Sequence, residues 1–379
     1  MSEYQYIGFL AIDGPVSAED LRYMHKQSSR AEITEWSFSN EYHFGDFRGD
    51  ALEMLRRGYD IHLHYADFGI TKLMIRLPAG LPNRSMTRKY LLGQGLKFVK
   101  DPSGLGGILV IDPYYDGCGE SDLIDPEEML NSLKPLRAEL MEGDLRPLYL
   151  AHLAVAQDSS HRPDKTHEAP VPAGLTSLTP AQQALADFYG LSQALIEAAA
   201  IESPPLPVSS CDETSRQEED WIRQLPEKLK VTWLLSVLRG DSASVRSEML
   251  AQFRRSQGRA LWPTNNPRRT MHQLQELEEK ALRRAEEQAA AVAARMRQQR
   301  LAEIASDPVK VLREIELCVA EKTSDANHRA VVLLCDLRDA VASTDQAGIA
   351  ESQALKLKKQ FPTRRALLNA LSRARLFSK

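Results

Sequence analysis

The stretch YDIHLHYADFGITKLMIRLP, residues 59–78, decides the fold of the N-terminal part of the chain. Apolar and polar side chains alternate before Asp67–Gly69 and a second apolar-rich run follows it, which is typical of two strands that meet at a tight turn. Pro78 has no backbone N–H to offer to a sheet, so it marks the end of the second strand. We therefore expect a β-hairpin over these residues.

Further strand and helix signals follow one another closely through residues 1–156. Apolar or alternating runs at 4–13, 30–39 and 104–115 favour strands. Short helical segments lie between them, for example SAEDLRYMHKQ at 17–27. Helices scattered among strands that are close in sequence predict an α+β domain, with a mixed or antiparallel sheet and helices on one face.

The chain changes character after residue 156. Residues 157–179 are rich in Pro, Ser, Thr and charge without an apolar period, which predicts a linker. Strand signals nearly vanish beyond it, and we expect an all-α C-terminal region. Its predicted parts are a helical domain at 180–265, a long helix at 266–305 and helical hairpins at 306–379.

The predicted long helix carries a narrow apolar stripe. Its members are Leu274, Leu277, Ala281, Ala285, Ala289, Val292 and Met296. They recur on average every ~3.7 residues, which suits a straight helix better than a left-handed coiled coil. Because most of the stripe is alanine, it buries little area, and we expect a strut.

Helix starts recur at residues 308, 326, 346 and 364 in the last part of the chain. Each start follows a residue that suits a helix N-cap, namely Asp307, Asp325, Asp345 and Thr363. Helices of similar length joined by short turns pack as antiparallel hairpins. We expect a small bundle, with a helical-repeat array as the alternative.

The composition is that of a globular protein, with 379 residues, 43% hydrophobic side chains and a formal net charge of -4. This charge gives no overall positive field that would attract nucleic acid or an anionic membrane. The four cysteines lie far apart and form neither a disulfide framework nor a zinc-binding spacing. With no signal-peptide pattern and no apolar run near ~20 residues, we expect a soluble, cytoplasmic protein without a membrane partner.

Four helical segments resemble those of bacterial SWIM zinc-finger proteins. They are DWIRQLPEKLKVTWLLSVLRG at 220–240, VRSEMLAQFRR at 245–255, ASDPVKVLREIELCVAEKTSDANHRAVVLLCDLRDA at 305–340 and RRALLNALSRARL at 364–376. The resemblance implies a bacterial protein whose helical region contacts DNA or protein partners. A SWIM motif requires C-x-C followed by C-x-H, which this chain lacks, so the zinc site of that family is not carried over.

Asp60, His62 and His64 occupy every second position of the predicted hairpin, which places them on one face of a strand. His43 would lie nearby if the preceding strand is a neighbour. Imidazole and carboxylate ligands suit zinc, iron or manganese, so these four residues are a candidate metal site. The favoured alternative is an ordinary strand face that is solvent-facing or hydrogen-bonded.

The segment NEYHFGDFRGD, residues 40–50, combines aromatic, charged and glycine residues, as recognition loops often do. Its candidate recognition residues are Tyr42, His43, Phe44, Asp46, Phe47 and Arg48. In the favoured alternative, the aromatic side chains pack into the sheet and Arg48 pairs with Asp46 or Asp50.

The end of the chain, residues 356–379, contains no Asp or Glu. Its basic residues include Lys356, Lys358, Lys359, Arg364, Arg365, Arg373 and Arg375. They are a candidate surface for phosphate backbones, where added salt would weaken binding, or for the acidic face of a protein.

No catalytic motif or cofactor loop accompanies these features, since the chain has neither G-x-x-x-x-G-K-[ST] nor G-x-S-x-G. We assign no catalytic residue and no cofactor, and enzymatic activity is left open without being favoured. The leading hypothesis is a non-enzymatic adaptor that docks a protein partner through its helical C-terminal region. The alternatives are nucleic-acid binding by the basic C-terminal helices and metal-dependent catalysis at His43, His62 and His64.

Overall fold

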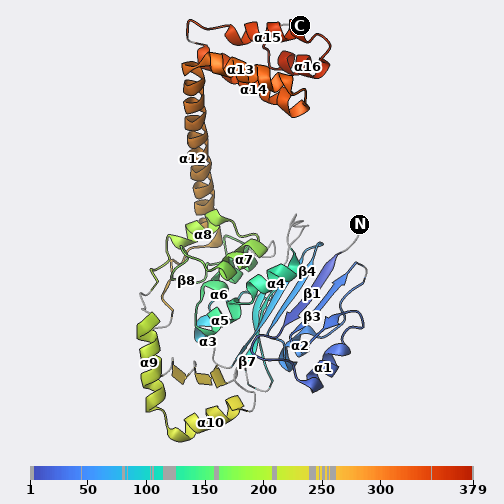
Figure 1. The fold of residues 1–379 in the computed structure, drawn as a ribbon. Helices are drawn as coiled ribbons and strands as arrows, with labels where there is room; N and C mark the ends of the chain where they lie inside the picture. Colours follow the sequence, from blue (N-terminus) through green and yellow to red (C-terminus); the bar gives the residue numbers. More distant parts are fainter. Residues whose placement is uncertain are drawn as a thin grey trace. The chain divides into compact units, whose positions relative to one another are not determined.

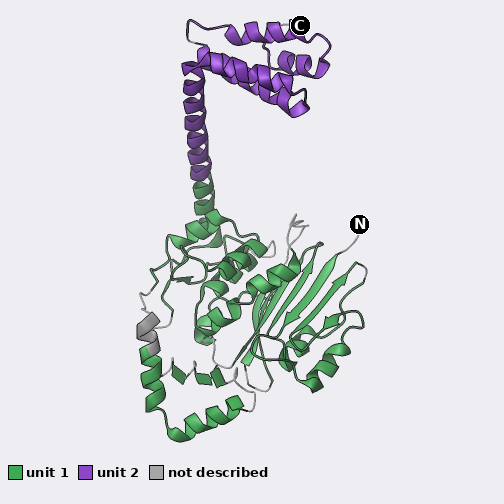
Figure 2. Ribbon diagram, in the orientation of Figure 1, with its two compact units in different colours: residues 1–282 green, residues 283–379 purple. Residues whose placement is uncertain are grey.

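The computed structural model divides the chain into two compact units, residues 1–282 and 283–379 (Figure 2). It describes residues 4–43, 45–78, 82, 84–102, 104, 106–113, 125–157, 162–206, 211–238, 245, 246, 248, 249, 252, 253, 256, 262–342 and 344–377, with only the backbone for 211–215. Among these residues, no helix combines the length and the apolar character that a membrane crossing requires.

A seven-stranded antiparallel sheet is the framework of the first unit, with strand order β2-β3-β1-β4-β5-β7-β6 (Figure 1). The strands are β1 (Gln5–Leu10), β2 (Glu32–Ile33), β3 (Ser37–Tyr42), β4 (Ile61–Ala66), β5 (Ile70–Pro78), β6 (Leu96–Lys100) and β7 (Gly106–Ile111). The predicted hairpin is confirmed, because β4 pairs with β5 in a register that sets Ala66 opposite Ile70.

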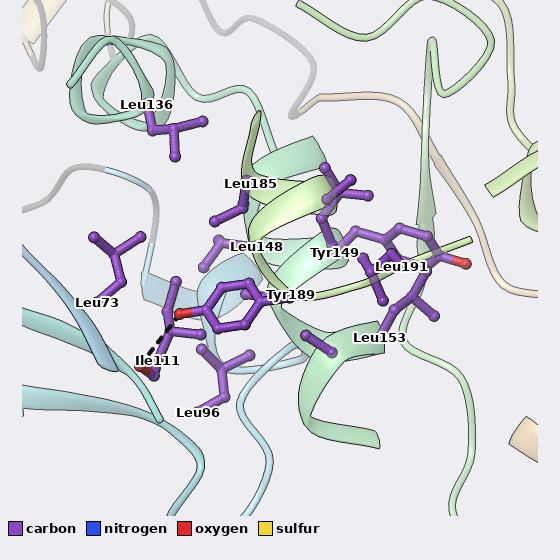
Figure 3. Close-up of a cluster of buried hydrophobic side chains, with 14 of the residues drawn as sticks. Leu73, Leu96, Ile111, Leu136, Leu148, Tyr149, Leu153, Leu185, Tyr189 and Leu191 are labelled. Atoms are coloured by element: carbon purple, nitrogen blue, oxygen red, sulfur yellow. Dashed lines mark hydrogen bonds between the residues drawn. The ribbon is translucent and has the colours of Figure 1, made fainter. Parts of the chain in front are cut away.

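One face of the sheet packs against a layer of helices. These are α4 (Pro126–Leu133), α5 (Leu136–Met141), α6 (Arg146–Ala156), α7 (Pro180–Phe188) and α8 (Gln193–Ala200). Figure 3 shows Leu73, Leu96 and Ile111 of the sheet facing side chains of this layer. The hydroxyl of Tyr189 donates to the carbonyl oxygen of Ile111, at 3.4 Å. Every residue of α6 is buried, which makes it the central helix of the core.

The opposite face is covered as well, so the expectation of helices on one face is wrong. The helices α1 (Ala18–His25) and α2 (Ala51–Arg57) contribute Met24, Met54 and Leu55 to a second core with Ile7 and Phe9 of β1. Strand β1 is buried at five consecutive positions, Gln5 to Phe9. A strand buried on both faces reads as a nearly continuous apolar run rather than as an alternation.

The segment predicted as a linker is part of the first unit wherever it is described, from residue 162 to 179. Ala169, Val171 and Leu175 are buried in the same core as the helices. Strand β8 (Val171–Pro172) pairs with β9 (Thr264–Asn265), a short strand that the sequence did not predict. Instead of tethering a separate domain, this segment joins the helices that follow it to the sheet.

Two further helices follow α8 in the sequence before the chain reaches β9, namely α9 (Cys211–Gln224) and α10 (Glu227–Leu238). The chain before α9 and the chain after α10 are held together by hydrogen bonds. The side-chain amide of Asn265 donates to Glu202 Oε2 at 2.7 Å, and the indole N–H of Trp262 donates to the carbonyl oxygen of Ala173 at 3.2 Å.

The predicted long helix is α12 (Met271–Ser306), which begins five residues later than expected and contains the boundary between the two units. Met271 and Leu274, at its start, are buried in the core of the first unit. The stripe residues Val292 and Met296 are exposed.

The second unit is a set of helical hairpins, as predicted. Its helices are α13 (Pro308–Ala320), α14 (Ser324–Val341), α15 (Ile349–Gln360) and α16 (Arg365–Arg373). Asp307 caps α13 as expected, accepting from the backbone N–H of Lys310 at 3.0 Å. The cap of α14 is Thr323 rather than Asp325, so this helix starts two residues before the predicted position. Arg297 and Arg300 of α12 pair with Asp339 and Asp336 of α14, each at 2.9 Å.

Candidate functional site

Asp60 is buried just before β4 and takes part in an internal charge network. Its Oδ2 accepts from the backbone N–H of Ile12 at 2.7 Å, and its Oδ1 lies 2.7 Å from Arg76 and 3.3 Å from Arg137. Burial by itself would raise the pKa of Asp60, but the two guanidinium groups and the Ile12 amide outweigh it and hold the pKa below its usual value. Arg137 also pairs with Asp13 at 2.5 Å. This carboxylate is already fully engaged by the protein.

His62 and His64 of β4 are likewise occupied by contacts within the sheet. The Nδ1 of His62 donates to the carbonyl oxygen of Gly8 at 2.9 Å, and its ring stacks on Phe9 with centroids 4.0 Å apart. The Nε2 of His64 donates to Gln5 Oε1 at 3.2 Å. Burial lowers the pKa of His62 to about 3 and that of His64 to about 4, so both rings are neutral at pH 7.

The fourth predicted ligand, His43, is exposed at the end of β3, where its ring lies 5.7 Å from that of Tyr4. The part of the chain that the structure describes contains no group of three or more His, Cys, Asp or Glu side chains placed to hold a metal ion. The structure therefore does not bring His43, Asp60, His62 and His64 together as a metal site.

We expect acid to destabilise the fold through His62. An unfolded chain protonates this ring near pH 6.5, whereas the buried ring in the folded protein stays neutral until about pH 3. The unfolded state thus binds more protons in this interval, and the free energy of unfolding falls as the pH falls. Between pH 7 and pH 5 this group alone accounts for a loss of about 2 kcal/mol.

His62→Gln tests this expectation, because glutamine is neutral throughout and can still donate to the Gly8 carbonyl. Urea unfolding gives the free energy of unfolding at pH 7 and at pH 5. The decrease between pH 7 and pH 5 should be about 2 kcal/mol smaller in the variant than in the wild type. The matched control is His25→Gln, at an exposed histidine of α1, which should keep the wild-type difference. An unaltered pH dependence in His62→Gln would contradict the neutral, buried state of this ring.

The predicted recognition loop is partly used for packing. The ring of Phe47 contacts those of Phe9 and Phe38, with centroids 6.2 and 5.9 Å apart. Asp46 accepts from the side-chain amide of Gln5 at 3.0 Å. Arg48 is exposed and Tyr42 is half-buried. Phe44 lies outside the described residues.

The predicted basic surface is divided between internal contacts and solvent. Lys356 pairs with Glu316 at 2.8 Å, Lys358 lies over the ring of Phe377 at 4.5 Å, and Arg364 donates to the carbonyl oxygen of Val319 at 2.8 Å. The remaining four are exposed, and no ion pair with another described residue is recorded for them: Lys359, Arg365, Arg373 and Arg375.

Helix α10 carries the densest group of exposed apolar side chains on the described surface. Its members are Val231 (46% exposed), Leu234 (68%), Leu235 (44%), Val237 (45%) and Leu238 (83%). Four of them follow the spacing i, i+3, i+4, i+7, which places them on one side of the helix. We call Val231, Leu234, Leu235 and Leu238 the α10 face.

The other side of α10 packs within the first unit. Trp233 is buried, and its ring lies 6.2 Å from that of Trp221 in α9, which in turn contacts Phe253 at 5.3 Å. Val237 lines a small cavity of about 260 Å³ next to Trp221 and Phe253. Helix α10 is thus fixed by one apolar side while the α10 face meets solvent.

The sequence contains a signal for the α10 face, although the pattern alone did not identify it. The run VTWLLSVL, residues 231–238, is apolar at six of its eight positions, and only Thr232 and Ser236 are polar. Most of such an apolar run is normally buried. In α10 only Trp233 is buried. Which side of the helix is buried depends on its packing against α9, which the sequence pattern does not show.

Comparisons with family models, with curated proteins and with solved structures find no match for this chain. The resemblance to SWIM zinc-finger proteins therefore transfers no residue roles, and the candidate sites stand on their geometry.

Proposed function

We propose that this protein is a non-enzymatic adaptor whose α10 face docks into an apolar groove of a protein partner. The observation that carries the proposal is the exposure of Val231, Leu234, Leu235 and Leu238 on a single helix. Contiguous exposed apolar surface is unfavourable in water and is characteristic of interaction sites.

The spacing of the α10 face favours a partner protein that presents a groove to it. Amphipathic helices that bind grooves present anchors at i, i+3, i+4 and i+7, and Val231 to Leu238 repeats this spacing. The helix is already formed and fixed through Trp233, so its docking does not include the entropic cost of folding a disordered segment. Its anchors are aliphatic, which calls for a partner groove lined by apolar side chains.

Site-specific photocrosslinking in the native cells tests the proposal. A photoreactive residue replaces Leu234, and the matched control carries it at Leu317 in α13, because both leucines are 68% exposed. We expect one discrete adduct with another protein at position 234 and none at position 317.

Three outcomes would overturn the proposal. The first is no adduct at position 234, and the second is the same set of adducts at both positions, which would indicate nonspecific contact. An adduct with twice the mass of this chain would identify a second copy as the occupant instead of a different protein.

A second function, nucleic-acid binding, is supported by the four exposed basic residues of α15, α16 and the turn after them: Lys359, Arg365, Arg373 and Arg375. Phosphate backbones attract such side chains without sequence preference, and each phosphate contact adds to the salt dependence of binding.

Gel-shift titration of DNA and RNA at 50 and 200 mM salt tests this function. Four phosphate contacts predict that affinity falls by about two decades between these concentrations. A variant with Gln at Lys359, Arg365, Arg373 and Arg375 should lose binding, while Lys310→Gln, at an exposed lysine of α13, should retain it. No shift at 50 mM salt, or equal shifts for the two variants, would exclude this function.

A further inference from the structure

A cavity of about 770 Å³ lies in the first unit beside the end of β5. Its apolar walls include Pro78, Leu91 and Phe98, and its polar lining includes Arg84, Arg88 and Lys100. Cavities that bind small ligands have volumes of roughly 300 to 1,000 Å³ and combine apolar walls with a few polar groups. The size and the lining of this cavity both fall within that description.

The aromatic wall is held in place by close backbone packing. The ring of Phe98 lies against Gly107 of the neighbouring strand β7, where an added Cβ would come within 2.4 Å of Phe98 Cε1. Gly106, at the edge of the cavity, has φ +142 and approaches the carbonyl oxygen of Leu77 so closely that a Cβ would lie 2.1 Å from it. Only glycine permits this approach, and the missing side chain of Gly107 likewise leaves room for the ring of Phe98 beside its strand.

The charges around the cavity are predominantly positive. Arg84, Arg88 and Lys100 are exposed, and no ion pair with another described residue is recorded for any of them. Arg84 and Arg88 are four residues apart around α3 (Arg84–Thr87), a spacing that sets side chains on the same side of a helical segment. Asp101 is the only acidic residue of the described lining, and the whole chain has a net charge of -4. The excess of positive charge is therefore local.

We propose that this cavity binds a small organic anion, with a carboxylate, sulfonate or phosphate group at Arg84, Arg88 and Lys100 and a flat apolar body against Leu91 and Phe98. Guanidinium groups form charge-assisted hydrogen bonds with such anions. Aromatic and aliphatic walls exclude water from the apolar part of the ligand. This site is independent of the α10 face, and the cavity lining shares no residue with that face.

The test uses two fluorescent probes that differ in one group. The anionic probe is 1-anilinonaphthalene-8-sulfonate, and the neutral one is N-phenyl-1-naphthylamine, which has the same rings without the sulfonate. Both are titrated into the full-length wild type and into the double variant Arg84→Gln, Arg88→Gln. We expect the double variant to bind the anionic probe at least tenfold more weakly and the neutral probe within twofold of the wild type.

Three control variants assign the effect to the cavity. Lys89→Gln removes an exposed charge outside the described lining and should leave both affinities unchanged. The variant Arg84→Lys, Arg88→Lys retains the charges and should bind the anionic probe within threefold of the wild type. The variant Leu234→Glu, Leu238→Glu alters the α10 face and should keep the anionic binding, which separates this site from the proposed docking function.

The proposal is overturned if the double glutamine variant binds the anionic probe as tightly as the wild type. It is also overturned if both probes lose affinity equally, because the loss would then not depend on the anionic group. Both arginine side chains are exposed, so circular dichroism should show the same thermal transition in the variants and the wild type.

Discussion

We expect glutamate in place of Leu234 and Leu238 to weaken binding of the proposed α10 partner at least 100-fold. Both leucines are exposed in the free protein, at 68% and 83%, so their replacement costs the unbound state little. In the complex, each replaced leucine removes the binding free energy that its apolar burial contributes, about 1.5 to 3 kcal/mol. Two such losses amount to at least 3 kcal/mol, which corresponds to more than two decades in Kd.

The measurement is calorimetric titration with the partner identified by crosslinking. The matched control is Leu317→Glu, which introduces the same charge at an equally exposed leucine and should bind within twofold of the wild type. Thermal unfolding should be the same for all three proteins. A loss of affinity smaller than fivefold for the double variant would mean that these leucines are not the anchors.

Asp60→Ala will reduce the free energy of unfolding by about 3 to 5 kcal/mol, as expected for breaking a buried ion pair. The carboxylate is buried between Arg76 and Arg137, and the side chain of Arg137 is only 6% exposed. Its removal leaves Arg137 with Asp13 as its remaining carboxylate and leaves the backbone N–H groups of Ile12 and Asp13 without this acceptor. Buried groups that lose their partners account for most of the cost.

Urea unfolding at pH 7 measures this loss. The matched control is Glu219→Ala in α9, whose ion pair with Arg223 is largely exposed and should be worth less than about 1 kcal/mol. Asp60→Asn keeps an oxygen acceptor for the Ile12 amide and should fall between the wild type and Asp60→Ala. A loss below about 1 kcal/mol in Asp60→Ala would show that the network is not needed for stability.

The antiparallel hairpin and the C-terminal helical hairpins could be predicted because both depend on local patterns. Strand β4 alternates in sequence and meets the apolar-rich β5 at a turn, and α13 begins at a proline preceded by the capping Asp307. The covered second face of the sheet could not be predicted in the same way. His62 and His64 look polar in the sequence, but the hydrogen bonds to Gly8 and Gln5 allow His62 to be buried and His64 to be half-buried.

The candidate sites were less predictable, because their geometry depends on residues far apart in the chain. Asp60 meets Arg137, which lies in another element 77 residues away, and no local spacing indicates that contact. The segment before α7 has the composition of a linker, yet Val171 finds a pairing partner in Asn265. The sequence analysis did not identify the cavity beside Arg84 and Arg88, because its wall is completed by Phe98 and Gly106 of strands that lie further along the chain.

The bonds that join Glu202 to Asn265 and Ala173 to Trp262 have a consequence for how this protein can change over evolution. These two hydrogen bonds join the chain before α9 to the chain after α10. We therefore expect that the exposed leucines of α10, such as Leu234 and Leu238, can be replaced without disturbing the sheet or the central helix α6.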